Sequence, residues 1–167
     1  MRFHAWAALG VAALVMLVLP PVALASQTYT DSASGYEVYA TSTEGTFIGT
    51  TSGVLPGSWG ATIDHTPLSP NAEITGGSFY LSTAIGGYPV VVTGRFSGGT
   101  VTRTNPGATG CVNQYYSVDA NLSNVGIGLS GSGTGSFVGT LTHHRTSIYG
   151  YCVTYSATIT GQLSLTF

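Results

Sequence analysis

Apolar and polar residues alternate along most of the chain after residue 25, and this period of two constrains the fold more than any other feature. Every second residue from Tyr155 to Phe167 is apolar or glycine, and the residues between them are Ser, Thr and Gln. Successive side chains of a strand point to opposite faces, so this segment predicts one long two-faced strand. The same pattern occurs, with apolar residues at the odd or even positions, in Tyr36–Ala40, Trp59–His65, Val90–Phe96, Val118–Leu122 and Phe137–His143. Because no segment has sustained helical spacing, we predict an all-β protein.

The first 25 residues have the organisation of a cleavable signal peptide. Arg2 and His4 precede an uninterrupted apolar run over residues 5–19, two prolines end that run, and residues 23–25 supply the small side chains that cleavage requires. A helix that crosses a bilayer needs about 20 apolar residues, so the run favours a removed leader over a permanent anchor. We therefore expect residues 1–25 to be a signal peptide. Residues 26–167 are then a single all-β domain secreted to the extracellular space or the periplasm.

Glycine recurs inside the predicted strands and favours closure of the sheet. Segments 45–50 and 135–140 are near copies, with the sequences Gly-Thr-Phe-Ile-Gly-Thr and Gly-Ser-Phe-Val-Gly-Thr. Glycine within a strand permits a bend or a bulge, and a phenylalanine between two glycines can lie over the gap that they leave. Strongly bent strands favour a barrel over a flat sandwich. We therefore predict a single small antiparallel β-barrel, with a β-sandwich as the alternative.

One of these glycine-rich segments also resembles a known group of proteins. Segment 133–140, Gly-Thr-Gly-Ser-Phe-Val-Gly-Thr, is similar to glycine-phenylalanine stretches in small secreted barrels of the dirigent and allene oxide cyclase type. The resemblance covers these eight residues of the chain. It implies a barrel fold, and it assigns no catalytic residue to this chain.

The low charge of the chain restricts its partners. Charged residues make up 6% of the sequence, and after the leader is removed the fixed positive charges are Arg95, Arg103 and Arg145. Nucleic acids and anionic membrane surfaces bind proteins with clustered positive charge, so we expect neither as a partner of this chain. Hydrophobic residues make up 43% and aromatic residues 11% of the chain, which predicts a packed core rather than disorder. The partner expected is a small molecule or a protein, and the oligomeric state stays open.

Two cysteines, Cys111 and Cys152, remain in the exported part of the chain. An oxidising compartment and an even number of cysteines favour a disulfide between them. Neither cysteine has a second one at the spacing of metal ligands, and a catalytic thiol would normally be unpaired. We therefore predict a Cys111–Cys152 disulfide.

The histidines after residue 25 lie in the two short polar segments Asp64-His65 and His143-His144-Arg145. By the alternation, His65 and His143 each close the apolar face of a predicted strand. If those strand ends meet, Asp64, His65, His143 and Arg145 form a small polar mouth that is a candidate ligand site. Two imidazoles with Asp64 or Glu73 could also hold a divalent metal or act as acid and base. Ligand sets normally need a third partner placed by the fold, so we predict no metal, no cofactor and no catalytic residue.

Taken together, these patterns predict a secreted soluble β-barrel that acts as a non-catalytic binding or structural module. A small outer-membrane barrel is one alternative, because such barrels often end in an alternating strand with a terminal aromatic residue. A small barrel enzyme with a histidine-containing mouth is the other. We favour the soluble barrel because the polar faces are chiefly Thr and Ser. The bulky residues expected to fill its interior are Trp59, Ile63, Phe137, Leu141, Ile159, Leu163 and Leu165.

Overall fold

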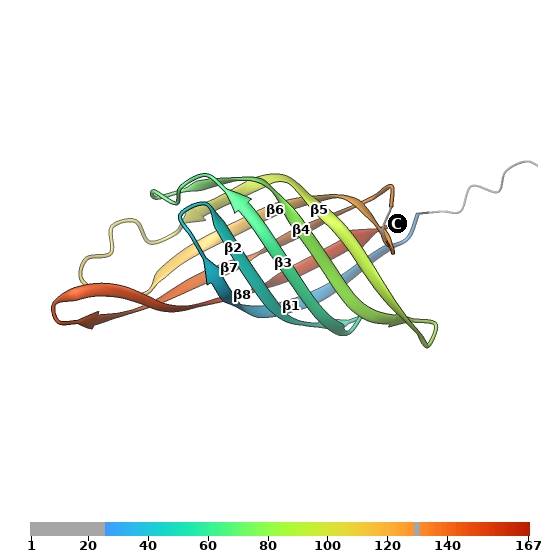
Figure 1. Ribbon diagram of the computed structural model, residues 1–167, viewed down its shortest axis with the longest axis horizontal. Helices are drawn as coiled ribbons and strands as arrows, with labels where there is room; N and C mark the ends of the chain where they lie inside the picture. Colours follow the sequence, from blue (N-terminus) through green and yellow to red (C-terminus); the bar gives the residue numbers. More distant parts are fainter. Residues whose placement is uncertain (1–25, 129–130) are drawn as a thin grey trace, which may run out of the picture.

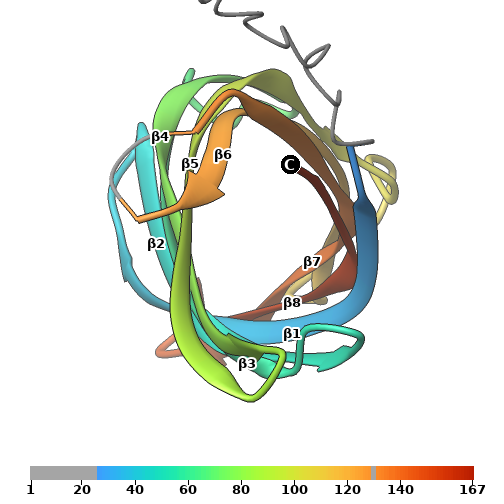
Figure 2. The ribbon, with the colours of Figure 1, turned by 90° about the vertical axis from the view of Figure 1, so that its right-hand side faces the viewer.

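The computed structural model of the protein describes residues 26–128 and 131–167, so the predicted signal peptide over residues 1–25 lies outside the described residues. The described chain forms eight strands that pair in chain order, each antiparallel to the next, and β8 pairs with β1 to close a barrel (Figures 1 and 2). The prediction of an all-β antiparallel barrel is confirmed. The strands are β1 (Thr28–Ala40), β2 (Glu44–Gly53), β3 (Gly57–His65), β4 (Ala72–Ile85), β5 (Tyr88–Arg103), β6 (Gln114–Ile127), β7 (Gly133–Ile148) and β8 (Tyr151–Thr166).

The two ends of the barrel are built differently. The connections β1–β2, β3–β4, β5–β6 and β7–β8 lie at one end, which we call the mouth end and which is on the left in Figure 1. At this end the β7–β8 hairpin extends past the rest of the wall (Figure 1). The start of β1 and the end of β8 lie at the opposite end, together with the β2–β3 and β4–β5 connections. Figure 2 views the barrel from that second end.

Apolar side chains fill the barrel and hydroxyl side chains face outward. The inward residues of successive strands form one buried cluster, in which Leu81, Val92, Ala120 and Val125 are completely inaccessible to solvent. This cluster contains all seven residues that are named from the sequence as the bulky filling of the interior: Trp59, Ile63, Phe137, Leu141, Ile159, Leu163 and Leu165. A barrel surrounded by water needs this orientation, whereas an outer-membrane barrel presents its apolar face to lipid. Separately, the described residues include no helix with the length and hydropathy needed to cross a membrane.

Large inward side chains pack against glycines of neighbouring strands. A Cβ atom on Gly139 or on Gly161 would lie 2.7 Å from Cζ of Phe137, so the phenylalanine ring covers this glycine pair. Gly139 on β7 and Gly161 on β8 are direct partners in the ladder. The arrangement explains why phenylalanine and glycine alternate in segment 135–140, and it accounts for the tight curvature of the wall there.

The face assigned to segment Tyr36–Ala40 is wrong in the structure. Tyr36 and Val38 are 53% and 49% exposed on the outer wall, and Gly35 and Glu37 point inward instead. A Cβ atom on Gly35 would lie 2.7 Å from Cζ2 of Trp59, so the large indole fills the space next to this part of β1. Local alternation identifies the face with the larger apolar residues, but here Trp59 supplies the bulk from β3, because Gly35 pairs with Gly49 of β2 and Gly49 pairs with Trp59.

The β2–β3 turn folds back into the core and closes the second end. Leu55 in this turn is 2% exposed, its backbone N–H donates to Oδ1 of Asp31 at 2.9 Å, and its carbonyl accepts from Oγ1 of Thr51 at 2.7 Å. Oγ1 of Thr83 donates to the carbonyl of Pro56 at 2.8 Å. Asp31, Thr51 and Thr83 are the buried polar side chains of the described residues, and all three hold this turn.

We predict that Asp31→Ala destabilises the barrel. The substitution leaves the buried N–H of Leu55 without its acceptor, and an unpaired buried donor costs about 1–3 kcal/mol. Urea unfolding of residues 26–167, followed by the fluorescence of Trp59, measures the change. The control is Asp119→Ala on the outer wall, which is exposed and should change the free energy of unfolding by about 0.5 kcal/mol or less. Equal stability of the two variants would contradict this account of the closed end.

Candidate functional site

A cavity of about 380 Å³ opens at the mouth end of the barrel, and we call it the mouth cavity. This volume lies within the range of about 300–1,000 Å³ that is usual for small-molecule sites. The residues that line the cavity come from every strand except β4 and from the β1–β2 and β3–β4 connections: Glu37, Ala40, Thr41, Ser42, Gly45, Phe47, Ile63, His65, Pro67, Leu68, Val101, Gln114, Tyr116, Val118, Leu141, His143 and Ile159.

The floor of the mouth cavity is apolar. Its deepest lining residues belong to the buried core cluster: Phe47, Ile63, Val101, Val118, Leu141 and Ile159. Farther along the barrel axis the interior holds a space of only about 30 Å³, lined entirely by core side chains. Small-molecule sites usually have about 300–1,000 Å³, so the filled core confines a ligand of this kind to the mouth end.

The rim of the mouth cavity is polar, and one of its histidines has a defined tautomer. Nδ1 of His65 lies 2.7 Å from the carbonyl oxygen of Thr66. A carbonyl only accepts hydrogen bonds, so Nδ1 carries the proton when the ring is neutral, and Nε2 is then the acceptor. His65 closes β3 and is half-buried, which places this acceptor at the edge of the cavity.

A second group of polar side chains lies across β6 and β7. The ring of His143 packs against Tyr116, with ring centroids 5.1 Å apart and planes inclined by 56°. The hydroxyl of Tyr116 donates to Oε1 of Gln114 at 3.0 Å. This bond occupies the amide oxygen of Gln114, so its amide nitrogen is the group that can donate to a ligand.

Burial shifts the pKa values of two residues in the mouth cavity. The pKa of His143 is lowered below its ordinary value, first by burial and then by the positive charge of Arg145 and the neighbouring imidazoles of His144 and His65. Burial raises the pKa of Glu37 above its ordinary value. Glu37 lies on the inner face of β1, where a Cβ atom on Gly45 would be 3.1 Å from its Oε1. His143 is therefore a neutral hydrogen-bonding group at pH 7.

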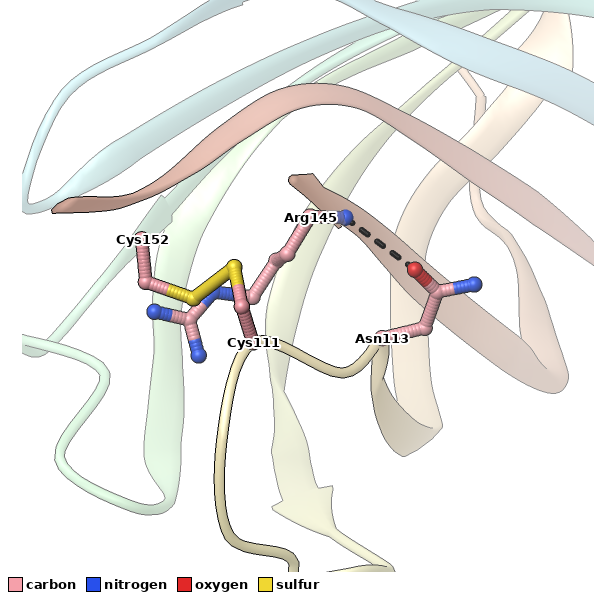
Figure 3. Close-up of a disulfide and its surroundings, with 4 residues drawn as sticks. All are labelled: Cys111, Asn113, Arg145 and Cys152. Carbon is pink, nitrogen blue, oxygen red and sulfur yellow. Dashed lines mark hydrogen bonds between the residues drawn. A yellow bond between two sulfur atoms is a disulfide. The ribbon is translucent and has the colours of Figure 1, made fainter. Parts of the chain in front are cut away.

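The structure brings together two of the four residues proposed from the sequence as a ligand mouth. His65 and His143 both line the mouth cavity. Asp64 is exposed on the outer wall, because neighbouring residues of a strand point to opposite faces. Arg145 lies beside the disulfide, and its backbone N–H donates to Oδ1 of Asn113 at 3.1 Å (Figure 3).

Sequence reasoning missed several polar residues of the mouth cavity: Glu37, Thr41, Ser42 and Gln114. Gln114 lies at the start of β6, and the pattern alone did not separate it from ordinary strand residues. Glu37 was missed because the outward face of β1 was taken as the inward one. The small residues Ala33 and Gly35, at positions that alternate with larger ones, are the signal that could have placed Glu37 inside.

The predicted disulfide is confirmed. Cys111 in the β5–β6 connection is bonded to Cys152 near the start of β8, with Cα atoms 5.4 Å apart (Figure 3). The bond ties the β5–β6 connection to the part of the β7–β8 hairpin that extends past the wall. Nδ2 of Asn105 donates to the carbonyl of Asn113 at 2.9 Å and helps to order the same connection. Two of the mouth-end connections are therefore fixed to each other.

A metal site would need several ligands placed together. Within residues 26–128 and 131–167, no three side chains of His, Cys, Asp or Glu lie close enough to hold a metal ion. His65 and His143 are thus the two potential nitrogen ligands of the mouth cavity, and the described structure places no third ligand beside them.

We predict that removing the disulfide destabilises the protein. Cys111 and Cys152 are 41 residues apart, and a cross-link that closes a loop of this size contributes about 4 kcal/mol through the unfolded state. Urea unfolding of the double variant Cys111→Ser with Cys152→Ser should show a loss of this order. Ser147→Ala, in the same hairpin, is the control and should leave the stability nearly unchanged. An unchanged midpoint in the double variant would contradict the prediction.

We also predict a pH dependence that originates at His143. Its folded pKa lies below the ordinary value of 6.5, so in the window between the two values the unfolded chain binds more protons than the folded chain. The contribution of His143 to stability is therefore lost as the pH falls through this window. NMR titration of the imidazole protons should show a pKa below 6.5, and Arg145→Gln should raise it. A pKa of 6.5 or above in the wild-type protein would refute the described burial of this ring.

Comparison of the chain with protein-family models, with curated proteins and with solved structures finds no match. No relative therefore supplies a function. The function must be argued from the mouth cavity and from the remaining surface of this chain.

Proposed function

We propose that the protein is a secreted, non-catalytic binding module whose mouth cavity holds a small amphipathic molecule. The observation that carries the proposal is the cavity of about 380 Å³, which has an apolar floor and half-buried polar side chains at its rim. Sites for small molecules combine a mainly apolar lining with a few polar groups that fix orientation. The disulfide supports export, because such bonds persist in oxidising compartments.

The rim groups restrict the polar end of the ligand. Nε2 of His65 accepts a hydrogen bond, and the amide nitrogen of Gln114 donates one. Glu37 adds a carboxyl group, which repels an anionic ligand when it is ionised. These groups together favour a neutral head that both donates and accepts, such as a hydroxyl or an amide. The apolar part of the ligand then contacts Val118, Leu141 and the other floor residues.

The scaffold around the cavity supports binding by holding its shape before the ligand arrives. The floor residues belong to the closed barrel core, and the disulfide restrains the β5–β6 connection against the β7–β8 hairpin. A preformed site loses less conformational entropy on binding than one that must order its loops. Binding is therefore the role for which this arrangement is best suited.

An acid–base enzyme is the second candidate, and the tautomer of His65 is the observation that favours it. An Nε2 atom with a free lone pair can take a proton from a substrate, and a half-buried carboxyl such as Glu37 can return one. A double variant, His65→Ala with His143→Ala, separates the two roles. A binding module still holds the apolar part of its ligand at the floor of the cavity in this variant, with the affinity reduced by the lost hydrogen bond to His65, whereas an enzyme that depends on the imidazoles loses turnover.

We predict that the neutral fluorescent probe N-phenylnaphthylamine binds to the mouth cavity and gives saturable fluorescence enhancement. Leu141→Trp adds bulk to the floor and should weaken the apparent affinity by about tenfold or more, equivalent to about 1.4 kcal/mol. Val138→Trp lies on the outer face of the same strand, where Val138 is 56% exposed, and should bind the probe as the wild type does.

Two results would contradict the proposed function. Fluorescence that rises without saturation in the wild type would mean that the probe has no defined site. Equal affinity in Leu141→Trp and Val138→Trp would mean that the probe binds elsewhere. The disulfide and the far-ultraviolet circular dichroism of each variant, compared with those of the wild type, show whether its fold is retained.

A further inference from the structure

A second hollow lies on the outer wall of the barrel, and we call it the wall groove. It has a volume of about 570 Å³ and runs over β3, β4, β5 and β6. The residues that line it include Thr62, Asp64, Ser78, Tyr80, Arg95 and Asn124. None of these residues lines the mouth cavity, so the two sites are separate.

The wall groove is hollow because the sheet is irregular there. The ladder between β4 and β5 is interrupted between the pair Glu73–Thr100 and the pair Ser78–Arg95. Gly77 and Gly94 line the groove at this point. A Cβ atom on Gly77 would collide with the carbonyl oxygen of Thr62, so the backbone of β4 approaches β3 closely beside the interruption. The β5–β6 ladder also shifts register, between Thr93 and Arg95. Bulges of this kind bend a strand and redirect its side chains, and they are frequent beside functional sites.

Tyr80 gives the groove a flat aromatic surface. A Cβ atom on Gly60 of the neighbouring strand would lie 2.5 Å from Cε1 and 2.6 Å from Cζ of this ring, so the ring covers Gly60. Gly60 and Tyr80 are direct partners in the β3–β4 ladder. The tyrosine is nevertheless 47% exposed. One side of the ring therefore packs on the strand while the rest is available to a ligand.

Three planar polar side chains line the groove together with this ring. Oδ2 of Asp64 is 3.4 Å from the position that a Cβ atom on Gly76 would take, so the carboxylate extends along the wall. Asn124 has a φ of 53°, a left-handed conformation uncommon for residues other than glycine, and it lies at a register shift between β6 and β7. A left-handed backbone conformation persists in a residue such as Asn124 only where the surrounding structure holds it. The side-chain amide of Asn124 lines the groove, as does Arg95.

We propose that the wall groove binds a neutral saccharide. A sugar ring has a face of C–H groups that can pack on an aromatic ring, and its hydroxyls both donate and accept hydrogen bonds. Tyr80 supplies the ring. Asp64 accepts, Arg95 donates, and the amide of Asn124 does both. The opposite charges of Asp64 and Arg95 offset each other, so a neutral ligand suits the groove better than an ion of either sign. The hydroxyls of Thr62 and Ser78 extend the same polar surface.

Affinity gel electrophoresis of residues 26–167 tests the proposal. The gels contain hydroxyethylcellulose, laminarin, galactomannan or amylopectin, which are neutral polysaccharides with different linkages. At least one of them should retard the wild-type protein. Tyr80→Ala should weaken that binding by about tenfold or more, while Tyr80→Phe, which keeps the ring, should retain it. Asp64→Asn should weaken it through the loss of a charged acceptor.

Matched controls separate the wall groove from the rest of the surface. Tyr88→Ala removes a tyrosine that is 76% exposed at the start of β5 and does not line the groove, and it should leave retardation unchanged. Leu141→Trp alters the mouth cavity alone and should also leave it unchanged. The absence of retardation by all four polysaccharides would overturn the proposal. It would also be overturned by retardation that persists in Tyr80→Ala, or by retardation that Leu141→Trp abolishes.

Discussion

The packing of large inward side chains against glycines of the barrel wall is the interaction on which the rest of the structure depends. The indole of Trp59 occupies the space that a side chain on Gly35 would need, and its Nε1–H lies 3.2 Å from the carbonyls of Ser34 and Thr50. Phe137 covers the glycine pair of β7 and β8 in the same way. Closing eight strands requires strong curvature and a narrow interior that side chains can fill. The small residues permit the curvature, and the aromatic rings occupy the interior.

Core side chains fill the middle of the barrel, and the two ends of the barrel differ in structure. At one end Leu55 enters the core, and buried polar side chains hold the turn that carries it. At the other end the apolar filling stops below the strand ends, where Glu37, His65 and His143 are half-buried beside a cavity. The disulfide braces that end. A site at the mouth therefore follows from the way the barrel is closed, and its polar groups lie where the core ends.

The sequence predicts the parts of this structure that local patterns determine. Alternation identifies β8 and the inward residues of β3 and β7, and cysteine number with export predicts the disulfide. Alternation also places His65 and His143 correctly at the ends of inward faces. Alternation assigns Glu37 to the wrong face of β1, because the inward face of this strand carries small residues. The indole of Trp59, from β3, occupies the space beside Gly35. Alternation cannot anticipate the wall groove either, since the interrupted β4–β5 ladder and the bulge at Asn124 depend on pairing between strands.

Methyl NMR during a titration with a neutral medium-chain alcohol, such as octanol, tests the central claim most directly. The account predicts saturable shift changes in the methyl groups of Ile63, Val118 and Leu141, which line the mouth cavity. The methyl groups of Leu55 and Leu81, which do not line it, should not change, because the core between them and the mouth is filled. Changes of equal size in both sets, or no saturable change at Ile63, Val118 and Leu141, would contradict the assignment of the mouth cavity as a binding site.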